Sequence, residues 1–443
     1  IDPLSSTANW TAEINQGSAN FGWSVATAGD VNGDGYSEVI VGAPNYDNGQ
    51  TDEGGVFVYH GSITGLSSSP SWSKEINEAS ANFGWSVATA GDVNGDGYSD
   101  VIIGAPYYDS VQTNEGRAYI YLGSASGLQS GFIWKFEVNQ ADANFGYSVA
   151  CAGDIDNDGY SEVIIGSPFY DGGLTDEGKV YLFYGSSTGL DPVTADWTYE
   201  SNQASAQLGF SVATAGDVNG DGFSDVIVGA SSNDAGGTNA GRAYVYFGGS
   251  SMNDIADVLL TGEAAIDGLG ISVATAGDVN GDGYSDLIVG ANLNDAGGSN
   301  AGRAYVYFGG SVMNNVADVT LTGVAVSDQF GISVSTAGDL NGDGYSDVIA
   351  GANLNDAGGA SAGRAYVYFG GNLMDSTADV LLTGAAANDQ YGSSVSTAGD
   401  MNGDGYSDLI IGADQNDAGG SSAGRVYLYD YFMKNEIIPD LSM

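Results

Sequence analysis

The sequence is poor in several residue types on which other classes of protein depend. Its 443 residues include one cysteine, one histidine, seven prolines and nine lysine or arginine residues. The single cysteine, Cys151, excludes an intramolecular disulfide. No apolar run approaches the roughly 18 residues of a membrane-spanning helix, so we expect no membrane insertion. The chain begins at Ile1 without a charged and apolar leader, and we expect a mature or excised form.

The shortage of basic side chains leaves a large excess of negative charge. There are 56 acidic residues and the formal net charge is −47. A field of this sign repels nucleic acid phosphates and anionic membranes, which excludes nucleic acid as a partner and favours cations. Hydrophobic residues still make up 42% of the chain, more than an acidic disordered segment would contain. The 71 glycines indicate many turns between short strands.

A motif recurs along the chain at a nearly constant interval. The segment ATAGDVNGDGYSE at residues 26–38 has six further copies, 61 to 63 residues apart. Within the second copy's unit, residues 85–90, 100–104, 117–122 and 132–138 form four short apolar runs bounded by turn residues. Four strands per unit are typical of a propeller blade. The sequence therefore predicts an all-β, seven-bladed β-propeller of four-stranded blades, with repeats that start near residues 21, 83, 145, 208, 269, 330 and 391.

The two ends of the chain predict how the ring closes. After the third strand of blade seven, at 425–429, no fourth strand follows, whereas WTAEIN at 10–15 parallels the fourth strand WSKEIN at 72–77. We expect residues 10–15 to form the outer strand of blade seven and thereby close the ring. Residues 1–433 would form one propeller domain, and residues 434–443 a tail or linker.

Each repeat carries the pattern D-x-[DN]-x-D-G-[YF]-S-[DE] between its first and second strands. Calcium takes six to eight oxygen ligands, which side chains at positions 1, 3, 5 and 9 and the carbonyl of position 7 can supply. A metal-free Asx-turn hairpin is the alternative for a single copy, but seven copies with three acids each favour Ca²⁺. The predicted ligands of the seven calcium sites are Asp30, Asn32, Asp34, Tyr36 and Glu38; Asp92, Asn94, Asp96, Tyr98 and Asp100; Asp154, Asp156, Asp158, Tyr160 and Glu162; Asp217, Asn219, Asp221, Phe223 and Asp225; Asp278, Asn280, Asp282, Tyr284 and Asp286; Asp339, Asn341, Asp343, Tyr345 and Asp347; and Asp400, Asn402, Asp404, Tyr406 and Asp408.

Together with these loops, two short motifs carry a family resemblance. Phe21-Gly22 with Gly42-Ala43-Pro44, and Phe83-Gly84 with the same GAP triplet at 104–106, resemble the FG-GAP repeats of the integrin alpha-subunit propeller. The resemblance implies a seven-bladed propeller with calcium loops on its lower face and partner recognition on its upper face. The third repeat departs from it with Gly166-Ser167-Pro168, and calcium loops occupy all seven blades, whereas integrin propellers carry them in a subset.

Aromatic residues gather in the upper-face loops of blades one to three. If the calcium loops lie below, the loops between strands two and three, and between consecutive blades, must lie above. The corresponding loops of blades four to seven carry the small sequence NDAGG. Aromatic residues dominate recognition surfaces, although these rings could instead pack between blades. The predicted partner-binding residues are Tyr46, Trp85, Tyr107, Tyr108, Tyr147, Phe169 and Tyr170, with Trp23 and Phe210 beside them.

Basic residues recur at the start of the third strand, which indicates an architectural role. We expect each to pair with an acid of its own upper loop, as Arg242 with Asp234. Six of the nine basic side chains occupy this position: Arg117, Lys179, Arg242, Arg303, Arg364 and Arg425.

The sequence favours binding over catalysis. His60 and Cys151 have no partners for nucleophilic chemistry, so we expect no enzyme. The leading hypothesis is a monomeric protein-interaction or adhesion scaffold, secreted or at the cell surface, where millimolar calcium fills loops of modest affinity. It could be one module of a longer chain. A lectin-like propeller that binds glycans, and a calcium-dependent polysaccharide lyase or lipase-associated module, are the alternatives; a pull-down and a glycan array separate the first two.

Overall fold

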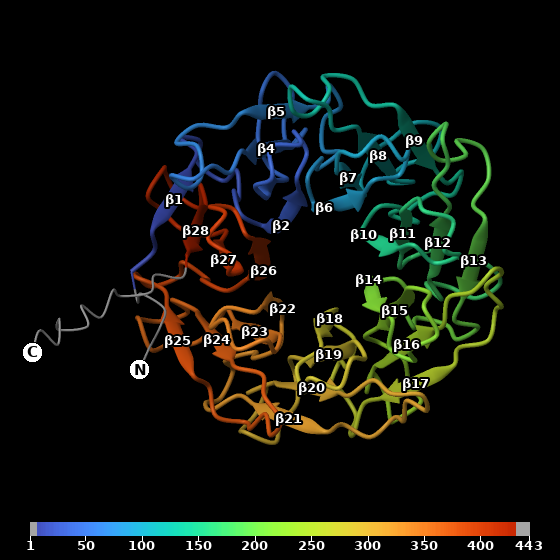
Figure 1. The fold of residues 1–443 in the computed structure, drawn as a ribbon, viewed down its shortest axis with the longest axis vertical. Helices are drawn as coiled ribbons and strands as arrows, with labels where there is room; N and C mark the ends of the chain where they lie inside the picture. Colours follow the sequence, from blue (N-terminus) through green and yellow to red (C-terminus); the bar gives the residue numbers. More distant parts are fainter. Residues whose placement is uncertain (1–6, 431–443) are drawn as a thin grey trace, which may run out of the picture.

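The computed structural model describes residues 7–430, which form seven four-stranded antiparallel sheets arranged as a ring (Figure 1). The first strand of each blade lies innermost in the ring, and the fourth lies at the rim. The first strands are β2 (Ser24–Gly29), β6 (Ser86–Gly91), β10 (Ser148–Gly153), β14 (Ser211–Gly216), β18 (Val273–Gly277), β22 (Val334–Gly338) and β26 (Ser394–Gly399). The second strands are β3 (Glu38–Ala43), β7 (Asp100–Ala105), β11 (Glu162–Ser167), β15 (Asp225–Ala230), β19 (Asp286–Ala291), β23 (Asp347–Ala352) and β27 (Asp408–Ala413).

The outer half of each blade is built from a longer third strand and a short fourth strand. The third strands are β4 (Gly55–Tyr59), β8 (Arg117–Tyr121), β12 (Lys179–Phe183), β16 (Arg242–Tyr246), β20 (Arg303–Tyr307), β24 (Arg364–Tyr368) and β28 (Arg425–Tyr429). The fourth strands are β5 (Trp72–Glu75), β9 (Trp134–Glu137), β13 (Trp197–Glu200), β17 (Val258–Thr261), β21 (Val319–Thr322) and β25 (Val380–Thr383), and β1 (Trp10–Glu13) serves blade seven. The predicted seven-bladed propeller of four-stranded blades is confirmed.

The core lies between the blades. Every residue of the second strands is buried, as their continuous apolar sequences predict for strands covered on both faces. One core cluster joins Ile40 and Val58 of blade one to Val87, Val101 and Tyr119 of blade two. Each blade is therefore stabilised by its neighbours, as in other repeat folds. Within residues 7–430, no helix is long and apolar enough to cross a membrane.

The N-terminal strand closes the ring as predicted. Strand β1 pairs antiparallel with β28, in a register that places Trp10 opposite Leu428 and Glu13 opposite Arg425. The Trp10 ring also packs edge-on against Tyr59 of blade one, at a centroid distance of 4.9 Å. The strand ends at Glu13, two residues before the predicted end, and the fourth strand of blade two is likewise shorter than predicted. The predicted tail, 434–443, lies outside the described residues.

The predicted pairing of the basic residues with their loop acids is wrong. The Arg242 Nε donates to Thr261 Oγ1 at 3.2 Å, while Asp234 Oδ1 accepts from the Asn239 backbone at 2.8 Å. The third strand begins directly opposite the end of the fourth strand, so Arg242 faces Thr261. This cross-strand neighbour is closer to the Arg242 side chain than the acids of the upper loop are. Four of the basic residues pair with glutamates near this edge: Arg117 with Glu137, Lys179 with Glu200, Arg303 with Glu263 and Arg425 with Glu13.

Candidate calcium loops and upper-face aromatic arc

Backbone N–H groups organise the acidic side chains of each loop. In blade one, Asp30 Oδ1 accepts from Gly33 N at 2.6 Å, and Asp30 Oδ2 accepts from Gly35 N at 2.8 Å. Asn32 Oδ1 accepts from Asp34 N at 2.8 Å. These bonds from the backbone follow from the short side chains of Asp and Asn at alternate positions. They order the side chains of positions 1, 3 and 5 in one tight loop, and backbone N–H groups donate to the side-chain oxygens of these three positions in all seven blades.

The acid at position 9 is buried and reaches the loop from the start of the second strand. Glu38 is fully buried and its Oε2 accepts from Val31 N at 2.7 Å. Burial raises the pKa of the Glu38 carboxyl to about 8, and the nearby charges of Asp30 and Asp34 add to this increase. Burial likewise raises the pKa of the position 9 acids of the other six blades, to about 7 or 8: Asp100, Glu162, Asp225, Asp286, Asp347 and Asp408.

The length of the position 9 side chain separates two kinds of loop. In the blades where this residue is glutamate, three carboxylates converge, with oxygen atoms within 4.8 Å of one another: Asp30, Asp34 and Glu38 in blade one, and Asp154, Asp156 and Glu162 in blade three. An aspartate has one methylene fewer. Both oxygens of the position 9 acid nevertheless accept backbone N–H groups in either kind of loop, as Asp100 does from Val93 at 3.0 Å and from Gly123 at 2.9 Å, and Glu162 from Ile155 at 2.6 Å and from Gly185 at 3.3 Å.

The donor atoms of the loops are those that calcium prefers. Carboxylate and amide oxygens are hard ligands, and carboxylates held this close repel one another unless a cation or proton lies between them. Burial raises the pKa of the position 9 acids because a buried carboxylate is destabilised unless a proton or a positive partner neutralises it.

Neighbouring loops are hydrogen-bonded to one another around the lower face. The position 8 serine of each blade donates its N–H to the position 1 carbonyl of the preceding blade, as Ser99 to Asp30 at 3.0 Å and Ser346 to Asp278 at 2.9 Å. The ring closes with Ser37, whose N–H donates to Asp400 at 3.1 Å. The seven loops therefore form one continuous circle.

An arc of aromatic rings lies at the opposite end of the innermost strands. Trp23, Trp85, Tyr147 and Phe210 each immediately precede the first strand of their blade. Successive ring centroids lie 4.7, 5.4 and 5.0 Å apart. Tyr107 and Phe169 extend the arc, at 5.4 Å from Trp85 and 6.0 Å from Tyr147. We call these six residues the aromatic arc; blades five to seven have Ile271, Ile332 and Ser393 at the corresponding inner position.

The three remaining predicted contact residues lie elsewhere. Tyr46, Tyr108 and Tyr170 are half-buried and pack on core clusters beside the third strands. The Arg117 guanidinium lies 3.7 Å from the Tyr108 ring centroid, and the Lys179 ammonium lies 4.8 Å from that of Tyr170. Of the seven predicted residues, the structure thus brings Trp85, Tyr107, Tyr147 and Phe169 together. Trp23 and Phe210 join them because the same repeat position carries an aromatic ring in four consecutive blades.

A comparison with protein family models identifies the repeat. The FG-GAP repeat model matches seven times, at residues 21–59, 83–121, 145–183, 208–246, 269–307, 330–368 and 391–429. The chain belongs to the FG-GAP repeat family. Each match begins at the predicted start of a blade repeat and ends with the third strand of that blade.

Curated relatives of this FG-GAP propeller include integrin alpha subunits and a phospholipase. Integrin alpha-V of Gallus gallus is 35% identical over 47% of this chain and 20% of its own length. Phosphatidylinositol-glycan-specific phospholipase D of Mus musculus is 27% identical over 93% of this chain and 55% of its own length. The chain thus spans about a fifth of the one and about half of the other. A crystal structure of BBS1N in complex with ARL6DN shares the fold, with a TM-score of 0.51, 11% identity, and coverage of 97% of this chain and 96% of that chain.

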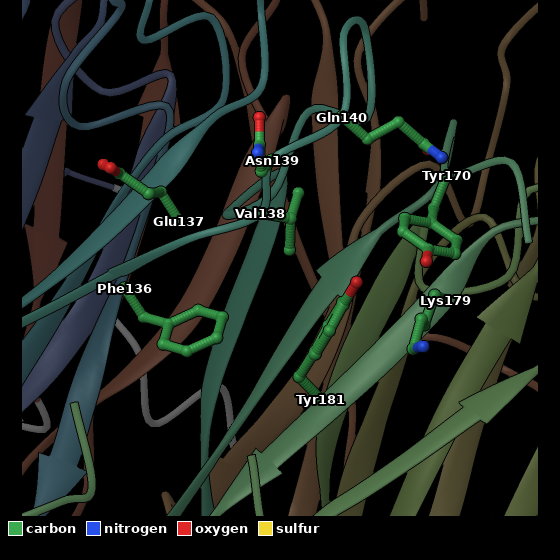
Figure 2. A pocket seen from close by; sticks show the side chains of 8 residues that line it. All are labelled: Phe136, Glu137, Val138, Asn139, Gln140, Tyr170, Lys179 and Tyr181. Atoms are coloured by element: carbon green, nitrogen blue, oxygen red, sulfur yellow. The ribbon is translucent and has the colours of Figure 1, made fainter. Parts of the chain in front are cut away.

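A shallow pocket opens at the rim of the FG-GAP propeller, between blades two and three (Figure 2). It has a volume of about 310 Å³ and is lined by Tyr170, Lys179 and Tyr181 among others. Two of its polar side chains already have partners: Gln140 exchanges two hydrogen bonds with the Asp171 backbone, at 2.8 and 2.7 Å, and Lys179 pairs with Glu200. Gln140 and Lys179 are therefore held in place within the rim of the propeller.

The two residues with nucleophilic potential lie in structural positions. Burial raises the pKa of the Cys151 thiol to about 11, which keeps it protonated at neutral pH. His60 follows β4, and its Nε2 is buried without a hydrogen-bond partner among the described residues. Burial lowers the pKa of His60. Neither residue forms an activated nucleophile and base pair.

Proposed function

We propose that this FG-GAP propeller is a calcium-stabilised scaffold that binds a protein partner through its upper face, outside the cytoplasm. The observation that carries the proposal is that the two ends of the innermost strands carry different kinds of side chain. Hydrogen-bonded carboxylate loops occupy the lower end of each, and the aromatic arc occupies the upper end in four of the seven blades. The carboxylates of the lower end favour binding of a cation, and the aromatic rings of the upper end favour binding of a partner.

Calcium in all seven loops is the first element of the proposal. Each loop supplies two Asp side chains, a third Asp or an Asn, and a buried position 9 acid, which is a hard-oxygen donor set. Calcium sites of modest affinity, as in extracellular modules, have dissociation constants of about 10⁻⁴–10⁻³ M. Such sites fill at the millimolar calcium concentrations outside cells, which supports an extracellular or cell-surface location.

The aromatic arc is the second element. Trp and Tyr are enriched at the energetic centres of interfaces because they bury large areas with little loss of side-chain entropy. Trp23 remains 37% exposed although it contacts Trp85, so one ring of the arc is accessible to a partner. Integrin alpha-V is named among the relatives, which supports a role in protein interaction or adhesion.

A glycan is the second candidate ligand, because the exposed Trp23 ring is also a platform on which a sugar can stack. An enzymatic role has weaker support, although one relative is named as a phospholipase, because Cys151 and His60 lack catalytic partners among the described residues. We therefore assign the chain a binding role.

The test is a binding screen with calcium as the variable. Immobilised protein would be exposed to extracellular and membrane protein extracts and to a glycan array, in millimolar CaCl₂ and in EDTA. We expect calcium-dependent capture of a protein that the Trp85→Ala variant loses. Capture only on the glycan array would favour the lectin alternative, and capture that is the same in EDTA would contradict the proposal.

A further inference from the structure

The chain contains one Asn-x-Ser/Thr tripeptide, at Asn9-Trp10-Thr11. In proteins that enter the secretory pathway, this tripeptide is the acceptor of an N-linked oligosaccharide. So short a motif also occurs by chance. It indicates a modification site only where the asparagine is exposed and its amide nitrogen is not used by the fold, and both conditions hold for Asn9.

Strand β1 lies at the rim of the propeller (Figure 1), and the exposed residue Asn9 immediately precedes it. The Asn9 N–H donates to Leu428 O at 2.9 Å, and Asn9 Oδ1 accepts from the Asp430 N–H at 3.3 Å. Among residues 7–430, Asn9 Nδ2 has no hydrogen-bond partner. The backbone and the side-chain oxygen thus hold the residue in place, while the nitrogen that would carry a sugar is free.

The other blades show that the fold uses only the side-chain oxygen at this position. In blades one and three to six, the residue before the fourth strand accepts the N–H of the residue after the third strand. An aspartate does so in four of these blades, as Asp196 Oδ2 accepts from Tyr184 N at 2.8 Å. Asn9 Oδ1 has the same role in blade seven, so this contact does not require the amide nitrogen.

The contacts of Thr11 show when a sugar could be attached. In the closed ring, Thr11 Oγ1 accepts from Arg425 Nη2 at 2.9 Å, and Thr11 pairs with Tyr427 across the sheet. A transferase cannot bind the tripeptide in its own groove while the hydroxyl and the strand have these partners. Thr11 and Arg425 are 414 residues apart in the sequence, and pairing over such a separation is slower than pairing of adjacent strands. The tripeptide therefore stays accessible until the ring closes.

We propose that Asn9 carries an N-linked oligosaccharide, attached before β1 pairs with β28. The inference rests on the extracellular location in the proposed function and adds a covalent modification to it. The donor is an oligosaccharide activated as a lipid-linked diphosphate. A bond forms between Asn9 Nδ2 and the anomeric carbon, the bond from that carbon to the diphosphate oxygen breaks, and the amide releases one proton to water.

An oligosaccharide on Asn9 would project from the lower end of the rim. Strand β1 is the outer strand of blade seven, and its first residue, Trp10, lies opposite Leu428 near the lower end of β28. The aromatic arc lies at the upper ends of blades one to four, so the sugar leaves the proposed partner surface accessible. A bulky hydrophilic group beside the edge of β1 also hinders pairing of that edge with other chains.

The test is the intact mass of the full chain recovered from its natural source, before and after treatment with peptide-N-glycosidase F. We expect the loss of one oligosaccharide and conversion of Asn9 to aspartate. The same measurement on variants secreted by a eukaryotic cell line identifies the acceptor. Asn9→Gln and Thr11→Val should carry no sugar, whereas Thr11→Ser keeps the hydroxyl and should keep the sugar.

Asp196→Asn, made together with Asn9→Gln, is the matched control for the timing. It creates the same Asn-Trp-Thr sequence at the equivalent exposed position, before strand β13. Strand β13 pairs with β12, the strand directly before it in the sequence. We therefore expect the sugar occupancy of this new site to be severalfold lower than that of Asn9 in the same cells. Equal occupancy would overturn the inference that late pairing of β1 exposes the acceptor.

The outcomes separate this inference from the proposed function. Secreted protein whose mass the glycosidase leaves unchanged would overturn the inference and leave the extracellular scaffold intact. Retention of the protein in the cytosol of its source would contradict both. A mass loss that persists in Asn9→Gln would place the sugar on another residue, which also overturns the inference.

Discussion

The ring of Tyr345 lies directly over the backbone of Gly281 in the preceding blade. A β-carbon on Gly281 would be 2.5 Å from Tyr345 Cε1, so a larger residue there would displace the ring. The two residues occupy positions 7 and 4 of adjacent calcium loops, and the same contact recurs with Tyr98 over Gly33 and Tyr36 over Gly403. The tyrosine at position 7 thus has a side-chain role that is separate from its carbonyl, because its ring packs on the position 4 glycine of the preceding loop at six of the seven junctions between blades.

We predict that Gly281→Ala destabilises the protein more than Gly283→Ala does. Both glycines have positive φ, 76° and 89°, so both substitutions incur a backbone cost of about 1 kcal/mol. A β-carbon on Gly283 meets nothing within 4 Å, whereas on Gly281 it displaces Tyr345, which adds about 1–3 kcal/mol of overpacking. Chemical denaturation in calcium measures the difference, and equal losses would show that the inter-blade contact contributes nothing.

Removing calcium should lower the melting temperature by many degrees. A ligand that binds only the folded state contributes about 2.7 kcal/mol per site at a hundredfold excess over its Kd, and the loops provide seven candidate sites. Scanning calorimetry in EDTA and in millimolar CaCl₂ tests this, with MgCl₂ as the control for ionic strength. Identical melting temperatures in all three would contradict calcium binding by the loops.

The calcium-free protein should lose stability as the pH rises. The position 9 acids have folded pKa values raised to about 7 or 8, as for Asp225 and Glu38, so the folded state binds protons more tightly than the unfolded state does. Stability then falls between the ordinary carboxylate pKa, near 4, and the raised values. We expect the melting temperature in EDTA to decrease from pH 5 to pH 8 and the calcium-bound protein to change less. A melting temperature in EDTA that is constant or rises over this range would refute the prediction.

Deleting residues 1–16 should impair the protein far more than deleting 434–443. The first deletion removes β1 and the Arg425 pair with Glu13, and it exposes the edge of β28. An open edge of this kind recruits other strands, so we expect aggregation on size-exclusion chromatography and a lower melting temperature. If the two truncated proteins were equally stable, β1 would be dispensable for closure.

Trp85→Ala should reduce binding of a captured partner with little effect on folding. Truncation of a central aromatic contact typically costs about 2 kcal/mol or more, which is about thirtyfold in affinity. Ile332→Ala changes the corresponding position of blade six and should leave binding within a few fold. Tyr108→Ala should instead lower the melting temperature, because it removes the ring under the Arg117 guanidinium. Equal binding by Trp85→Ala and the wild type would place the partner site outside the arc.

The repeat made the fold predictable from the sequence, whereas side-chain contacts between neighbouring strands could not be predicted from it. The strict recurrence of apolar runs and Asx loops predicted seven blades, and the orphan strand at 10–15 predicted closure. The pairing of Arg242 was predicted wrongly because sequence proximity favoured Asp234, while the sheet register offers Thr261. The division of the aromatic residues into the arc and the strand-packing tyrosines depends on side-chain direction, which spacing alone does not give.

The pairing of β1 with β28 also orders events during synthesis. The strand made first has no partner until the last blade has left the ribosome, since its contacts span more than 400 residues, as between Thr11 and Arg425. Six blades can form and stack in the order in which they are translated, but β1 must wait as an unpaired segment with Trp10 uncovered. Completion of the fold is therefore a single late event, and a chain that stops before blade seven cannot close the ring.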